Sequence, residues 1–216
     1  MSAKFLEQRA LLLNLHHQLF DAGLVVWSGG NISQRVEGGF LIKPSGLMYP
    51  QLTTESMVYC DLDGNVIDGD FAPSSDTAAH AYVYKNMPEV GGVVHTHSSY
   101  ASAFAAVNEP IPCILTAIAD EFGGDIPVGP FAEIGDDSIG RGIVSTLTGH
   151  RSKAVLMAQH GVFTIGKDAR SALKAAVMCE DVAKSAHLAK GLGTPKRLPQ
   201  DAIDRLFNRY QNVYGQ

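Results

Sequence analysis

The chain has 216 residues, of which 45% are hydrophobic and 18% are charged. This length and composition suffice for one large core, so we expect a single domain over residues 1–216. The formal net charge of −5 leaves no basic surface to neutralise a phosphate backbone, and we expect no nucleic-acid partner. No apolar run approaches a membrane span and the three cysteines are scattered, so we expect a cytoplasmic protein without membrane attachment.

The chain is predicted to begin with a helix and then a turn that can bind an anion. Leu12, Leu15 and Leu19 recur at helical spacing and predict a buried helix face. A glycine-containing turn follows, in which backbone amides around Gly30 and the side chain of Asn31 could hold an anion. An ordinary turn is the alternative interpretation of this segment.

A second turn of the same kind follows an apolar strand at residues 40–42. It contains Lys43, Ser45 and Gly46, and the lysine can supply positive charge. A plain β-turn is the alternative here as well. A hairpin is predicted over residues 57–67, because an Asp-Gly pair lies between two apolar segments.

The next helix is predicted from about residue 73 to residue 87, and its first turn carries Ser74, Ser75 and Asp76. Serine hydroxyls and the free amides of a helix N-terminus together form an anion pocket. Ordinary N-capping is the alternative explanation. The histidines that follow favour the functional one.

An apolar strand at residues 93–98 contains His95 and His97. Strand side chains alternate between faces, so these two imidazoles point the same way and can share one metal ion. A divalent metal such as zinc usually takes three or four protein ligands. The third candidate is His160, which follows a second buried strand, and the fourth is Asp76. Any one of the histidines alone would more often be an ordinary side chain, but the combination favours a metal site.

The remainder of the chain is predicted to be mainly helical. An extended segment at residues 111–115 and a polar connection at residues 116–124, which contains Asp120, separate these helices. The helices themselves are predicted at residues 100–107, 137–147, 168–190 and 200–210.

Taken together, these motifs resemble the class II aldolase/adducin family, and within it most closely the 4-epimerases that act on L-ribulose 5-phosphate. The matching segments follow in order over nearly the whole chain: Gly30-Asn31, Lys43-Pro44-Ser45-Gly46, Pro73-Ser74-Ser75-Asp76-Thr77, His95-Thr96-His97-Ser98, Asp120, Gln159-His160-Gly161 and Tyr214-Gly215-Gln216. The resemblance implies a three-layer α/β/α sandwich with a mainly antiparallel central sheet. It also implies a homotetramer with active sites between neighbouring subunits.

The resemblance further implies a role for each matching residue. The zinc ligands would be Asp76, His95, His97 and His160, with Mn²⁺ or Co²⁺ as alternative ions. The substrate and phosphate contacts would be Gly30, Asn31, Lys43, Ser45, Gly46, Ser74 and Ser75. The acid/base groups would be Asp120 and Tyr214.

The implied activity is a zinc-dependent epimerisation at C4 of a pentulose 5-phosphate by retro-aldol and aldol chemistry, most simply from L-ribulose 5-phosphate to D-xylulose 5-phosphate. An alternative is a class II aldolase that cleaves a ketose 1-phosphate such as L-fuculose 1-phosphate to dihydroxyacetone phosphate and an aldehyde. Asp76 favours the epimerase, because the similar aldolases carry a glutamate there, whereas residues 126–132 resemble the aldolase branch. A third alternative is an adducin-like assembly module without catalysis.

Overall fold

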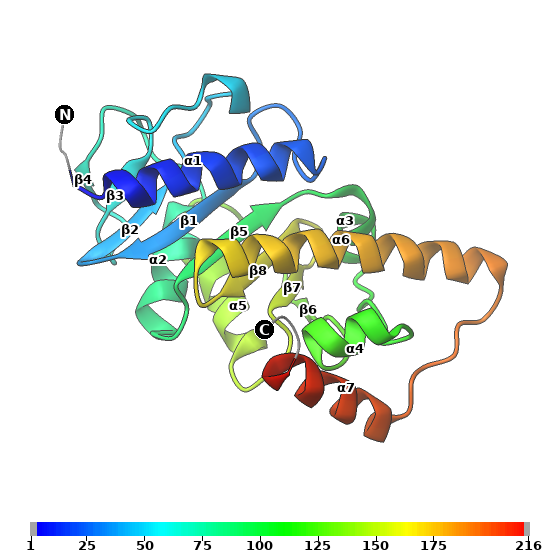
Figure 1. Cartoon of the computed structure of the whole chain (residues 1–216). Helices are drawn as coiled ribbons and strands as arrows, with labels where there is room; N and C mark the ends of the chain where they lie inside the picture. The colour runs from blue at the N-terminus through cyan, green and yellow to red at the C-terminus, as the bar shows by residue number, and fades with distance from the viewer. Residues whose placement is uncertain (1–3, 214–216) are drawn as a thin grey trace.

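The computed structural model describes residues 4–213 and contains one central sheet (Figure 1). The strands of this sheet are β1 (Asn31–Val36), β2 (Gly39–Ile42), β3 (Val58–Cys60), β4 (Val66–Asp68), β5 (Gly92–Thr96), β6 (Val128–Gly129), β7 (Ala154–Met157) and β8 (Gly161–Gly166). They lie in the order β4-β3-β2-β1-β5-β8-β7-β6, and only the pair of β6 and β7 is parallel. The sheet is therefore mixed and mostly antiparallel.

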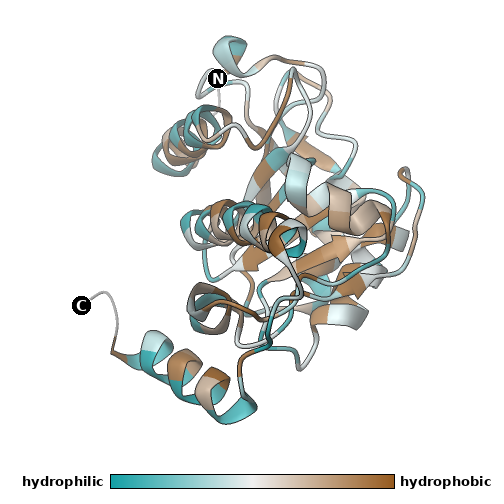
Figure 2. Ribbon diagram, turned by 90° about the vertical axis from the view of Figure 1, so that its right-hand side faces the viewer, coloured by the Kyte–Doolittle hydropathy of each residue, from teal (hydrophilic) through white to brown (hydrophobic). Residues whose placement is uncertain are grey.

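Helices cover both faces of this sheet. They are α1 (Leu6–Asp21), α2 (Thr77–Asn86), α3 (Ser99–Ala106), α4 (Thr116–Phe122), α5 (Ser138–Leu147), α6 (Ala169–Leu192) and α7 (Gln200–Asn212), with a short 3-10 helix at Tyr49–Gln51. On β5, Val93 packs with α2 and α5 on one face, whereas Val94 packs with α1 and α6 on the other. Figure 2 shows the apolar strands between the helices. The predicted three-layer α/β/α sandwich is thus confirmed.

Periodicity alone predicted several of these elements correctly. The helix face of Leu12, Leu15 and Leu19 is fully buried, and the long helix expected at residues 168–190 is α6. The hairpin expected at residues 57–67 corresponds to β3 and β4, which pair antiparallel. These elements have regular apolar spacing, which local sequence is sufficient to reveal.

The segment at residues 116–124 corrects one prediction, because α4 occupies most of what was expected to be a polar connection. Ile118, Ala119 and Phe122 are buried on one side of this helix, and Gly123 ends it with a left-handed φ of 65°. Polar side chains on the other side obscured the helical spacing. The expected extended segment at residues 111–115 forms only an isolated bridge at Ile111.

Strands β1 and β8 were also missed by sequence reasoning. On β1, the polar residues Asn31 and Ser33 are buried and face α2, so the usual alternation of buried apolar and exposed polar residues is absent. Strand β8 is buried along its whole length and shows no alternation either.

None of the helices in the described part of the chain has the length and apolar character to cross a membrane.

Candidate metal centre and anion pocket

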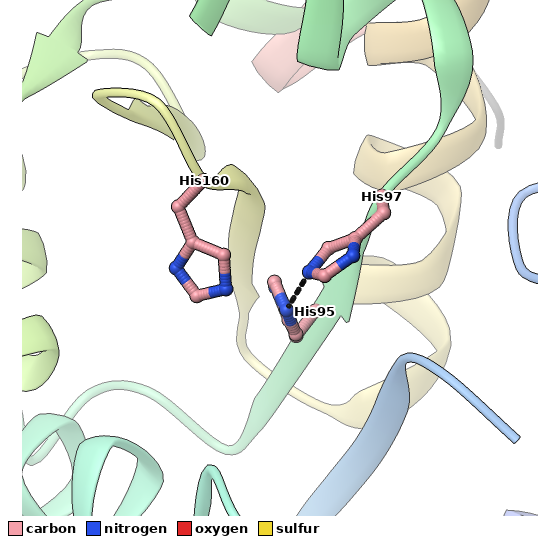
Figure 3. A group of neighbouring side chains, drawn as sticks. All are labelled: His95, His97 and His160. Atoms are coloured by element: carbon pink, nitrogen blue, oxygen red, sulfur yellow. Dashed lines mark hydrogen bonds between the residues drawn. The ribbon is translucent and has the colours of Figure 1, made fainter. Parts of the chain in front are cut away.

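Three histidines meet where β5 ends beside the turn between β7 and β8. His95 lies on β5, His97 follows the strand, and His160 lies in the turn (Figure 3). Because β5 and β8 pair antiparallel, the turn is held next to the end of β5. Gln159 enters the turn with a left-handed φ of 56°, and its amide donates to the carbonyl of Ala105 at 2.9 Å. The predicted clustering of the histidines is therefore present in the structure.

The geometry of this cluster and the lowered pKa of two of its histidines fit a divalent metal ion. Ligand nitrogens of His95, His97 and His160 all lie within 4.8 Å of one another. The Nδ1 of His95 faces the carbonyl of Val162 at 2.9 Å; when Nδ1 carries the proton, the lone pair of Nε2 points toward Nε2 of His97, which is 2.9 Å away. Burial lowers the pKa of His95 to about 3 and also lowers that of His160. Neutral imidazoles in this arrangement are the donors that zinc prefers.

Asp76 lies beside the histidines as the residue immediately before α2, although its oxygens are not within the same 4.8 Å group. Its Oδ2 accepts a hydrogen bond from Asn31 Nδ2 at 2.7 Å, while the buried Oδ1 has no hydrogen-bond partner among the described residues. Burial alone would raise the pKa of this carboxyl, but charge interactions with His95 and His80 and the Asn31 hydrogen bond hold it below its ordinary value. A buried carboxylate with one free oxygen suits a fourth ligand.

All seven residues predicted to contact substrate line one hollow of about 260 Å³, and Asp76 lines it as well. The wall of this hollow consists of Ser28, Gly29, Gly30, Asn31, Lys43, Pro44, Ser45, Gly46, Ser74, Ser75 and Asp76. Lys43 is only 2% exposed, and burial lowers its pKa to about 8. An ammonium, serine hydroxyls and the start of a helix favour an anion in this hollow.

The close approach of the two sites depends on Gly30. Its φ is +71°, and a Cβ at this position would lie 2.5 Å from Val25 Cγ1 and 2.9 Å from the carbonyl oxygen of His95. Only glycine therefore lets the turn before β1 pack against β5. This contact holds the anion pocket next to the candidate metal centre.

Asp120 lies away from the histidine cluster within the chain. It lines a different hollow of about 270 Å³, together with Ala117, Met178, Arg209 and Tyr210, and none of the three histidines lines it. Helices α4, α6 and α7 supply the residues of this hollow, and α4 and α7 pack against each other (Figure 1). The other predicted acid/base residue, Tyr214, lies outside the described residues.

Sequence reasoning did not single out Ser28 or His80. Ser28 belongs to the predicted turn, and its carbonyl accepts a hydrogen bond from Lys43 Nζ at 3.0 Å. His80 lies one helical turn after Asp76 and is fully buried. The spacing of four residues from a candidate ligand was the available signal for His80.

The chain is similar to known proteins over most of its length. The family described as Class II Aldolase and Adducin N-terminal domain matches residues 10–187. L-ribulose-5-phosphate 4-epimerase UlaF from Salmonella paratyphi C is 39% identical over 91% of this chain and 92% of that protein. The structure of an L-fuculose 1-phosphate aldolase has a TM-score of 0.90, is 26% identical and covers 98% of both chains. That of YgbL from Klebsiella pneumoniae has a TM-score of 0.79, is 28% identical and covers 93% of this chain and 98% of that chain. The chain therefore belongs to the class II aldolase and adducin family.

Proposed function

We propose that the protein is a zinc-dependent epimerase that inverts C4 of a pentulose 5-phosphate, most simply converting L-ribulose 5-phosphate to D-xylulose 5-phosphate. The observation that carries this proposal is a cluster of three histidines beside an anion pocket, with Asp76 lining the pocket next to the cluster. A phosphorylated sugar needs both features. The 39% identity to an L-ribulose-5-phosphate 4-epimerase supports the choice of reaction.

In this proposal, His95, His97, His160 and Asp76 hold the metal, with Mn²⁺ or Co²⁺ as alternatives to Zn²⁺. The bound ion would supply Lewis acidity to the carbonyl and hydroxyl oxygens of the ketose, which favours cleavage of the adjacent carbon–carbon bond. The anion pocket binds the phosphate through Lys43, the serines and the first amides of α2. Fixing the phosphate there orients the sugar toward the histidines.

Epimerisation also needs proton transfer on two faces of the released aldehyde. In the cleavage step the bond between C3 and C4 breaks, and the proton of the C4 hydroxyl passes to a base. After the aldehyde rotates, the bond re-forms on its other face and a proton returns to the oxygen. We assign these two transfers to Asp120 and Tyr214. Positioned groups of this kind typically contribute about 10²- to 10⁴-fold each.

We further propose that Asp120 and Tyr214 act on the metal centre of a neighbouring subunit in a homotetramer. The separate hollow that contains Asp120 supports this arrangement, because none of the three histidines lines it. Mixing Asp120→Asn subunits with His97→Ala subunits tests it. Mixed tetramers should recover activity that neither variant has alone, whereas an active site within one chain would give no recovery.

An aldolase acting on a ketose 1-phosphate is the second candidate. The TM-score of 0.90 to an L-fuculose 1-phosphate aldolase favours it. The aspartate at position 76 favours the epimerase, since the similar aldolases have glutamate there. An adducin-like module without catalysis is a third candidate, and stoichiometric zinc in the purified protein would argue against it.

The three cysteines are free and buried, which supports a cytoplasmic location.

The deciding experiment offers the zinc-loaded protein L-ribulose 5-phosphate and, separately, L-fuculose 1-phosphate, and follows the products by NMR. An epimerase gives D-xylulose 5-phosphate from the first sugar, and an aldolase gives dihydroxyacetone phosphate from the second. His97→Ala is the inactive control, and His17→Ala is its match, because His17 is exposed on α1. Turnover of neither sugar would refute both enzymatic candidates.

A further inference from the structure

Five buried polar side chains form a ladder between α2 and β1. On the helix side, Asp76, His80 and Tyr84 recur every four residues and therefore lie on one stripe. On the strand side, Asn31 and Ser33 are two residues apart and therefore point to the same face. We call these five residues the polar ladder. Its Asp76 end is at the candidate metal centre.

Hydrogen bonds join the members of the polar ladder across the layer. The Oγ of Ser33 lies 2.7 Å from the hydroxyl of Tyr84 and 2.6 Å from Nδ1 of His80. At the other end, Asn31 Nδ2 donates to Oδ2 of Asp76 at 2.7 Å. Ser33, His80 and Tyr84 are at most 1% exposed, so water in bulk does not compete for these bonds.

One assignment of protons satisfies this chain. The buried hydroxyl of Tyr84 has Ser33 Oγ as its hydrogen-bond acceptor, so Tyr84 donates to Ser33, and the proton of the Ser33 hydroxyl is directed to His80. Nδ1 of His80 then accepts from the hydroxyl of Ser33, and Ser33 in turn accepts from the hydroxyl of Tyr84. The reverse assignment would make Ser33 donate to Tyr84 and would leave the buried Tyr84 hydroxyl proton without an acceptor among the described residues. Ser33 and Tyr84 therefore fix which tautomer His80 adopts.

Three atoms of the polar ladder are left without partners among the described residues, namely Oδ1 of Asn31, Oδ1 of Asp76 and Nε2 of His80. Oδ1 of Asp76 and Nε2 of His80 are both buried, and neither has a hydrogen bond among the described residues. The first is a free acceptor, the second is a free donor, and their residues lie one helical turn apart on the same stripe. The two side chains also interact electrostatically, and a hydrogen bond between them, direct or through one water, would satisfy both atoms.

We propose that His80 is a positioning residue for the metal centre, and that its Nε2–H orients the carboxylate of Asp76 toward the ion. Ser33 and Tyr84 act through His80 by holding its tautomer. This inference rests on the proposed function only in taking Asp76 as a metal ligand. Partners that orient a ligand in this way commonly change metal affinity by about 10- to 100-fold when they are replaced.

The stability of the fold does not explain the polar ladder. A buried polar group that lacks a partner is costly, whereas an apolar side chain of similar shape in its place is often neutral or stabilising. His80 packs against Phe163, with ring centroids 6.2 Å apart, so a phenylalanine at position 80 has apolar surroundings to contact. His80→Phe should therefore remain folded and keep the stability of the metal-free protein.

The test measures Zn²⁺ affinity of the purified metal-free protein by competition with a chromophoric chelator, and records the visible absorption of the Co²⁺-loaded protein. His80→Phe should weaken Zn²⁺ binding about 10- to 100-fold and alter the Co²⁺ spectrum. His80→Gln should recover most of this loss, because its amide can accept from Ser33 and donate to Asp76. Tyr84→Phe should show a smaller loss.

Thr164→Val is the matched control, because Thr164 is also fully buried and its hydroxyl donates to the carbonyl of Ala172, outside the polar ladder. It should leave both readouts unchanged. Wild-type affinity and an unchanged spectrum in folded His80→Phe would overturn the positioning role. Retention of zinc by His95→Ala would instead refute the proposed metal centre itself, so the two failures are distinguishable.

Discussion

Lys43→Met is expected to weaken binding of a phosphorylated sugar while it stabilises the folded protein. The ammonium of Lys43 donates to the carbonyls of Ser28 at 3.0 Å and Pro44 at 3.2 Å, and no carboxylate within residues 4–213 forms an ion pair with it. A hydrogen bond to a charged group contributes about 1.5–3 kcal/mol. Losing one to the phosphate should raise KM by about 10- to 150-fold.

The sign of the stability change follows from the pKa of Lys43. Burial lowers it from 10.5 to about 8, so between these two pH values the unfolded chain binds more protons than the folded one. The free energy of unfolding therefore rises with pH over this range. At pH 7, where Lys43 is charged in both states, the burial of its charge lowers the free energy of unfolding. Removing the charge should raise it by about 1–2 kcal/mol, less than the full shift implies because the hollow is open to solvent.

Two measurements check this prediction: KM as a function of pH, and urea unfolding at pH 7. The wild-type KM should rise above about pH 8 as Lys43 loses its proton, whereas the KM of Lys43→Met should not respond to pH there. Lys85→Met is the control, because Lys85 is exposed and paired with Asp63 at 2.6 Å. An unchanged KM together with lower stability would show that Lys43 is a structural residue and would refute the reasoning.

Three further predictions concern the metal, acid stability and a backbone contact. His160→Ala should lose stoichiometric zinc in elemental analysis, because it removes one of few ligands, and a variant with full zinc content would exclude His160 as a ligand. Burial lowers the pKa of His16 to about 3, and its Nε2 accepts a hydrogen bond from the amide of Ile32 at 3.0 Å. The folded state thus favours neutral His16, so the free energy of unfolding should fall as pH drops from about 6.5 to about 3, by up to about 1.4 kcal/mol per pH unit. His16→Gln should flatten this dependence in urea titrations, and an unchanged slope would contradict it. Gly39→Ala should lower the melting temperature sharply, because its Cβ would lie 2.0 Å from a backbone oxygen of β3. Gly191→Ala, where nothing lies within 4 Å, should be neutral or stabilising in the same thermal scan.

Local sequence was sufficient to predict the features that depend only on residues close together in the chain. The same-side arrangement of His95 and His97 follows from strand alternation, and the burial of Leu12 and Leu15 follows from helical periodicity. The start of α2 near Ser74 and Ser75 was also predicted from local sequence, although the helix begins at Thr77 and not at residue 73. Such features require no knowledge of distant segments, since backbone geometry alone places the side chains.

Only the tertiary structure decided which distant segments meet. Pairing of β1 with β5 sets Asn31 opposite His95, and pairing of β5 with β8 holds the turn that carries His160. No local pattern indicated β1 or β8, because polar residues facing α2 and burial on both faces removed the expected alternation. The location of Asp120 in a separate hollow likewise followed from the packing of α4 on α7. Register and packing between segments far apart in the chain depend on the whole core, and a local pattern does not contain that information.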